Sequence, residues 1–205
     1  MNLISNFSII STVAVAMYSL KSKNQSDLQK WMRIYCLVNA SVEIIAFVLA
    51  RFGVNNIPLF YILILTEISV IIQFFYVATN FVFKIKKLHL FIFVYSILLA
   101  LIFQLDSFKN FSTYVAIFEG FIVFIFCLFY LANEIKNPSV SNIVKAPVFW
   151  FVSAFLIYYG CSWLILLGTQ LFAIEQELFI YIWDGQNILN ILKNVLITIG
   201  LLCLR

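Results

Sequence analysis

Long, uninterrupted apolar stretches of about 18 to 25 residues are the feature that most constrains this chain. A helix rises ~1.5 Å per residue, so a stretch of this length matches the ~30 Å hydrocarbon core of a bilayer. An outer-membrane barrel would instead alternate apolar and polar residues over segments of ~10 residues. Only 11% of the residues are charged, against ~25% in a soluble domain. The sequence therefore predicts an all-α, polytopic membrane protein.

Polar breaks such as "KSKNQSDLQK", "FGVNNIP" and "KIKK" divide the chain into seven candidate spans. The break before the last span, "AIEQEL", is the least polar of them. We expect a single seven-helix transmembrane domain over residues 1–205. Its spans are predicted at about 3–20, 31–51, 59–83, 88–105, 114–133, 148–171 and 180–204.

Basic residues predict how the spans are oriented. Ten Lys and Arg residues lie in the first, third and fifth loops and at the C-terminus, against two in the other loops. Since basic loops stay in the cytoplasm, we expect the N-terminus outside and the C-terminus inside a bacterial inner membrane. The start "MNLISNFS" has no basic segment, so the first span is expected to be a retained anchor. With inner loops this short, we expect no kinase, cyclase or DNA-binding domain.

Composition also argues against several classes of function. The net charge of +4 comes from residues scattered at the ends of apolar runs, which disfavours a nucleic-acid partner. The four cysteines lie inside apolar runs without paired spacing, and His89 is the only histidine, so neither a disulfide nor a metal site is predicted. No nucleophile motif occurs. We therefore expect no enzyme activity and no cofactor.

Ionisable side chains inside the predicted spans are the main functional signal. A charge at the middle of a bilayer costs at least ~2.5–3.5 kcal/mol on insertion scales, and such residues usually face the protein interior. Helical rise puts all of them in the outer half or near the midplane of the membrane. These residues are Glu43, Glu67, Glu119 and Lys193.

The last span adds a polar arc. At ~100° per residue its polar side chains fall within ~120°, the width of one buried helix face. The arc comprises Gln186, Asn187, Asn190, Lys193 and Asn194. Together with the carboxylates it predicts a polar pocket open to the outside. Two structural alternatives remain: the amides only bond neighbouring helices, and Lys193 either extends to an interface or neutralises a buried carboxylate.

Four stretches of the chain resemble a family of uncharacterised seven-helix membrane proteins that is common in Bacteroidetes. They are 42–76, 116–129 ("AIFEGFIVFIFCLF"), 147–158 ("PVFWFVSAFLIY") and 187–200 ("NILNILKNVLITIG"). The resemblance implies the seven-helix fold and brings no activity with it. The shared polar features that it implies are Glu43, Asn56, Glu67, Glu119, Gly120, Trp150 and the asparagines 187, 190 and 194; Lys193 departs from the pattern.

Several functions fit these observations. The first is a small-molecule sensing or accessory module that binds a small polar or cationic ligand and signals through a separate membrane or cytoplasmic partner. The second is a proton-coupled transporter or channel that uses the buried glutamates, although no inverted repeat or broken helix pair is visible. A retinal-binding protein, with a Schiff base on Lys193 and Glu67 as counterion, and a membrane effector of a defence or stress system are minor alternatives.

Overall fold

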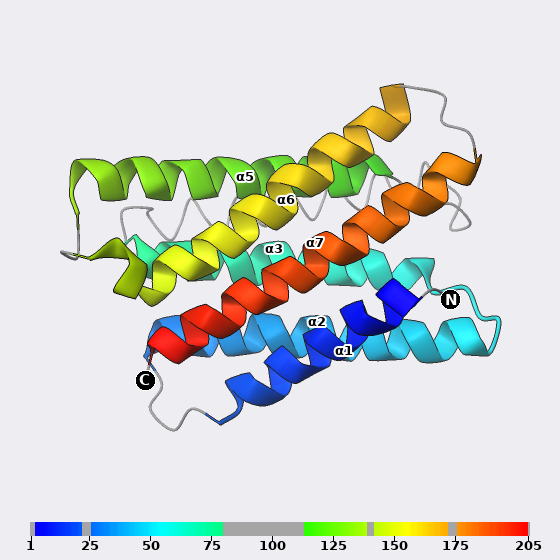
Figure 1. The fold of residues 1–205 in the computed structure, drawn as a ribbon, viewed down its shortest axis with the longest axis horizontal. Coiled ribbons are helices and arrows are strands. Elements are labelled where there is room, and N and C mark those ends of the chain that lie inside the picture. The colour runs from blue at the N-terminus through cyan, green and yellow to red at the C-terminus, as the bar shows by residue number, and fades with distance from the viewer. Residues whose placement is uncertain (1–2, 22–25, 80–112, 139–141, 172–175, 205) are drawn as a thin grey trace. The chain divides into compact units, whose positions relative to one another are not determined.

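The structure is a computed structural model that describes residues 3–21, 26–79, 113–138, 142–171 and 176–204 (Figure 1). Every regular element in these ranges is a helix, and none is a strand. The all-α prediction is confirmed for this part of the chain. The span predicted at 88–105 lies outside the described residues.

Five of the described helices are long and apolar enough to cross a membrane. They are α2 (Asp27–Arg51), α3 (Ile57–Ala78), α5 (Thr113–Lys136), α6 (Pro147–Leu171) and α7 (Gln176–Cys203). The first helix, α1 (Leu3–Ser19), is apolar but shorter, and a single 3₁₀ turn, η1 (Ile143–Lys145), precedes α6. A multi-pass membrane protein is the class that these helices support.

The helix boundaries depart from the predicted spans where polar residues belong to a helix. The start of α2 lies at Asp27 rather than at residue 31, because Ser26 and Gln29 form a capping box. Ser26 accepts a hydrogen bond from the Gln29 amide, and the Gln29 side chain accepts one from the Ser26 amide. Similarly, α5 continues past residue 133 to Lys136. Helices thus extend beyond the apolar stretch that predicts a span.

The chain divides into two compact units. We call Met1–Asn24 together with Ala116–Arg205 the terminal unit, and Gln25–Val115 the middle unit. The terminal unit contains α1, α5, α6 and α7, and the middle unit contains α2 and α3. The N-terminal helix therefore groups with the C-terminal half of the chain rather than with the helix that follows it. The single-domain assignment stays a prediction.

Within the terminal unit, α1 and α7 run in the same direction (Figure 1). Asn190 contacts Ser8, and Asn194, one turn later, contacts Ser11. Residue numbers thus rise together along the two helices.

The neighbouring helix α6 runs the opposite way to both α5 and α7 (Figure 1). Along α7, Gln186 lies at Ser162 and Gly200 at Phe151. Along α5, Gly120 lies against Trp163, whereas Phe124 lies against Gly160. The helices α1, α5 and α7 therefore share one direction, and α6 has the other.

In the middle unit, a tight turn joins α2 to α3. Gly53 has a φ of 68°, and its amide donates to the Ala50 carbonyl, while the Val54 amide donates to the Leu49 carbonyl. This hydrogen-bond pattern is a Schellman motif, which ends a helix at a left-handed residue. The side-chain amide of Asn56 also donates to the Ala46 carbonyl at 3.3 Å. The stretch "FGVNNIP" is thus a turn, as predicted.

Candidate functional site

The polar arc of α7 meets two different helices. Asn190 and Asn194 face α1, whereas Gln186 and Lys193 face α6. Asn187 donates to the carbonyl of Trp183 on its own helix, at 3.0 Å. The sequence predicted one inward face; in the structure this face divides between two helix contacts.

The contact between α1 and α7 is a row of hydrogen bonds, which we call the α1–α7 seam and which comprises Ser8, Ser11, Thr12, Asn190 and Asn194. The Asn190 amide donates to Ser8 Oγ at 2.8 Å and to Thr12 Oγ1 at 3.3 Å. The Asn194 amide donates to Ser11 Oγ at 2.8 Å and to Thr12 Oγ1 at 2.9 Å. Both asparagines are buried.

Two hydroxyl groups of this seam, those of Ser11 and Thr12, accept these bonds while donating their own protons within α1. Ser11 Oγ and Thr12 Oγ1 each donate to the carbonyl of Ser8 on their own helix, at 2.7 and 3.2 Å. A hydroxyl has one donor and two acceptor sites, so its oxygen remains available to an asparagine. Hydrogen bonds between membrane helices contribute ~0.6 kcal/mol each. The four contacts thus hold α1 modestly, but in a defined register.

On the other side of α7, a second polar contact reaches α6. Ser162 Oγ donates to Gln186 Oε1 at 2.7 Å. Further along, the ammonium of Lys193 lies 4.3 Å from the centre of the Tyr158 ring. Lys193 is only 2% exposed, so its side chain is enclosed by protein rather than extended to the surface. A cation over an aromatic face gains up to ~2 kcal/mol when it is desolvated, which offsets part of the burial cost.

Glu119 is buried on α5, next to a close approach of two helices. A Cβ added at the neighbouring Gly120 would lie 2.7 Å from Cβ of Trp163 and 3.3 Å from the Tyr159 carbonyl oxygen. The glycine therefore lets the α5 backbone approach α6 directly. The ring of Phe121 adds an edge-to-face contact with Trp163 at 5.5 Å. Glu119 is thus positioned by a rigid helix pair.

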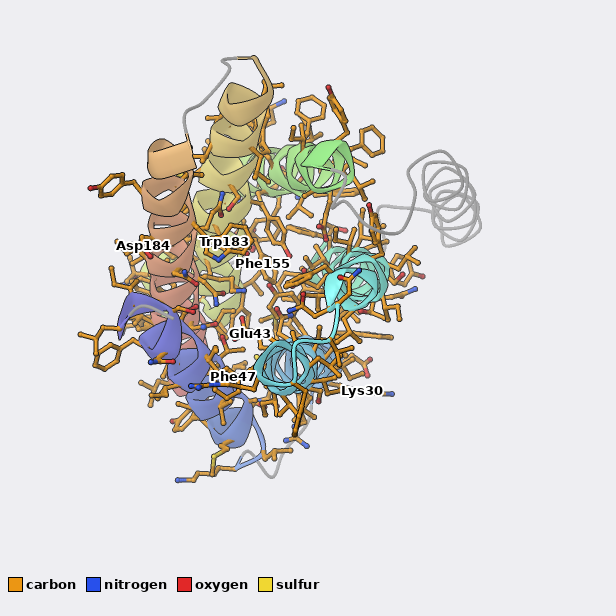
Figure 2. All side chains as sticks on the ribbon, turned by 90° about the vertical axis from the view of Figure 1, so that its right-hand side faces the viewer. Lys30, Glu43, Phe47, Phe155, Trp183 and Asp184 are labelled. Atoms are coloured by element: carbon orange, nitrogen blue, oxygen red, sulfur yellow. The ribbon has the colours of Figure 1, made fainter. Side chains whose placement is uncertain are left out.

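The middle unit contributes the other two predicted carboxylates. Glu67 on α3 is buried, and Glu43 on α2 is half-buried. Figure 2 views α2 end-on and shows Lys30 on one side of this helix and Glu43 and Phe47 on the other. The exposed Lys30 and the half-buried Glu43 therefore belong to different faces.

Sequence reasoning did not assign the partners of these residues. Ser8, Ser11 and Thr12 share a face of α1, and their spacing of three and four residues is the signal that could have found them. Tyr158 is among the polar residues that the sequence places in the middle and outer part of its span, but its contact with Lys193 could not be assigned, because aromatic residues are common throughout the spans. Among the described residues, no group of three or more His, Cys, Asp or Glu side chains could hold a metal ion.

Comparison with known proteins adds no relative to this description: no protein-family model, no curated protein and no solved structure matches the chain.

Proposed function

We propose that this chain is a membrane-embedded sensing or accessory module that binds a small polar or cationic ligand in the outer half of a seven-helix bundle and acts through a separate partner. The observation that carries the proposal is the burial of ionisable side chains within apolar helices. Glu67, Glu119 and Lys193 are 6%, 4% and 2% exposed. Buried charges in membrane helices are expensive to maintain and are usually functional.

The seven-span count is supported by the helix directions. Since α1 and α5 run the same way, the chain between them must return to the side on which α1 began. The α2–α3 hairpin crosses the membrane twice, so the chain leaves it on the same side as it entered. One more crossing is needed, which supports a span within residues 80–112, where the sequence predicts one. The resemblance to the seven-helix family of Bacteroidetes belongs to the same proposal.

The orientation in a bacterial inner membrane is supported by charge. Given the helix directions, α1 and α5 end on the side where α2 and α6 begin. The described basic residues at that side are Lys21, Lys30, Arg33, Lys136 and Lys145. At the opposite side the described basic residue is Arg51. Basic residues favour the cytoplasmic side, so the N-terminus is assigned to the outside.

The seam narrows the set of ligand-binding residues. Because Asn190 and Asn194 use their amide donors on α1, the ligand contacts within the terminal unit fall mainly on Glu119 and Lys193. Glu43 and Glu67 are the candidate residues of the middle unit. Asn187 is half-buried and one turn nearer the outside. A carboxylate and an ammonium in the terminal unit favour a zwitterionic or cationic ligand, such as an amino acid or a small amine.

Ligand-dependent stabilisation tests this proposal. The protein in nanodiscs would be heated with each member of a panel of amines and amino acids. A ligand at 100 times its Kd stabilises the folded state by ~2.7 kcal/mol, which raises the unfolding midpoint. We expect a compound that stabilises the wild type and does so much less in Glu119→Gln.

Glu134→Gln is the matched control, because Glu134 is also a buried carboxylate on α5 but lies near its other end. It should respond to the compound like the wild type. A panel without any stabilising compound, or equal responses in both variants, would count against the binding site.

The same carboxylates support proton-coupled transport as a second candidate, because buried Glu side chains serve as proton relays in carriers. In that case Glu67→Gln would abolish proton-driven uptake by proteoliposomes, whereas a binding module would show no uptake in the wild type either.

A further inference from the structure

The first helix is short for a membrane span. Its 17 residues span about 25 Å, which is less than the ~30 Å hydrocarbon core. Polar groups without hydrogen-bond partners are disfavoured in hydrocarbon. Besides its apolar residues, α1 contains Ser5, Asn6, Ser8, Ser11, Thr12 and Ser19. Of the six long helices described, α1 is the one with fewer than 18 residues.

The polar and apolar residues of α1 lie on different faces. The large apolar side chains Leu3, Phe7, Ile10 and Met17 are exposed and suited to lipid. The buried face instead consists of small or hydroxyl-bearing residues: Ser8, Thr12, Val15, Ala16 and Ser19. This buried face supplies Ser8 and Thr12 to the seam with α7. Ser11 and Thr12 already donate to the Ser8 carbonyl within α1. The seam adds hydrogen-bond donors to the hydroxyl oxygens of this face, which lipid cannot supply.

The partner that covers this face is made last. In sequence, α1 is followed by α2, but it belongs to the terminal unit with α7. Until α7 has been made, neither Asn190 nor Asn194 is available to Ser8, Ser11 and Thr12. We propose that α1 becomes stably transmembrane only when α7 is in place, and that the α1–α7 seam holds it across the bilayer.

Accessibility of the N-terminus tests this dependence. A short epitope tag is added before Met1, and spheroplasts are treated with protease from outside. In the wild type the tag should be digested. In Asn190→Leu/Asn194→Leu the digested fraction should fall severalfold, because the hydroxyl oxygens of α1 no longer accept hydrogen bonds from α7. A tag that stays as accessible as in the wild type would overturn the proposal.

Asn187→Leu is the matched control. Asn187 lies on the same helix and is also an asparagine, but it donates to its own helix at Trp183. Its replacement removes an amide without removing a contact to α1, so the tag should remain accessible. An equal loss in this variant would mean that any polar loss in α7 disturbs the N-terminus, which contradicts a role for the seam.

A rescue variant separates insertion from general misfolding. Ser8→Val, Ser11→Val and Thr12→Val, added to the double asparagine variant, make α1 apolar on both faces. The helix should then partition into the bilayer without α7, and tag accessibility should return. Failure to recover would overturn the proposal.

The inference rests on the orientation proposed above, with the N-terminus outside. The same experiment tests the orientation separately from the dependence of α1 on α7. A wild-type tag that is protected from external protease contradicts the orientation. A wild-type tag that is digested, with no change in the asparagine variants, contradicts only the dependence of α1 on α7.

Discussion

At the scale of single residues, Gly120 occupies a position where any side chain would overlap the neighbouring helix. An added Cβ would meet Cβ of Trp163 at 2.7 Å and the carbonyl oxygen of Tyr159 at 3.3 Å. Both atoms are fixed to the backbone of α6, so no change of rotamer can relieve the overlap. The helices α5 and α6 would have to separate.

Gly120→Ala should therefore reduce the free energy of unfolding by about 1–3 kcal/mol, the usual range for overpacking. The measurement is the SDS-induced unfolding transition in mixed micelles. Gly168→Ala on α6 is the control, since nothing lies within 4 Å of a Cβ added there. Alanine should be neutral or stabilising at that helical position by about 0.5–1 kcal/mol. Similar destabilisation in both variants would contradict the close approach at Gly120.

The asparagines of α7 illustrate what a sequence can predict about a residue. Their burial followed from their spacing, because polar groups in a membrane helix avoid lipid. Their partners did not follow, since an arc of ~120° is wide enough to meet two neighbouring helices. Ser8 and Asn190 are 182 residues apart, and no local pattern connects them. The ligand-binding role of the candidate site stays a prediction.

At the scale of elements, turns and caps decide where the helices end. The motif Ser26-x-x-Gln29 is a capping box that could have been identified in the sequence, and it extends α2 beyond its apolar stretch. The turn after α2 depends on the left-handed conformation of Gly53. Unlike Gly120, Gly53 has open space around an added Cβ, so only its backbone conformation disfavours other residues.

Gly53→Ala should destabilise the protein by about 1–2 kcal/mol, the cost of a left-handed residue that carries a Cβ. SDS-induced unfolding again provides the measurement. Gly185→Ala on α7 serves as control, because its site is equally open but its φ is not positive. If the two variants unfold alike, the left-handed turn is not what constrains position 53.

At the scale of the whole molecule, the helix directions and the basic residues make the same prediction about sidedness. The α2–α3 turn should lie outside and the end of α5 inside. Val54 and Asn137 are exposed residues at these two positions. Their labelling can therefore test the orientation directly.

In intact cells, Val54→Cys should react with a membrane-impermeant maleimide, whereas Asn137→Cys should react only after the membrane is opened. The wild type provides the background, because it contains the exposed Cys161 and Cys203. The reverse labelling pattern would invert the orientation.

The class and most of the described helices could be predicted because apolar length directly reflects bilayer thickness. The grouping of α1 with α7 could not, since neighbours in a bundle depend on side-chain complementarity between distant segments. The five residues of the seam carry that complementarity.

The contacts between α5 and α6 have a mechanical consequence. Gly120 lies against Cβ and Cα of Trp163. Gly160 lies against the ring of Phe124, a carbon of which would lie 3.0 Å from an added Cβ. The helices therefore approach each other backbone to backbone at Gly120, and α5 inserts the Phe124 ring where α6 has no side chain. Sliding by one turn would bring residues that carry side chains into both of these close approaches. The two close approaches thus oppose sliding of α5 along α6, whereas α1 is held to α7 by hydrogen bonds that can exchange partners.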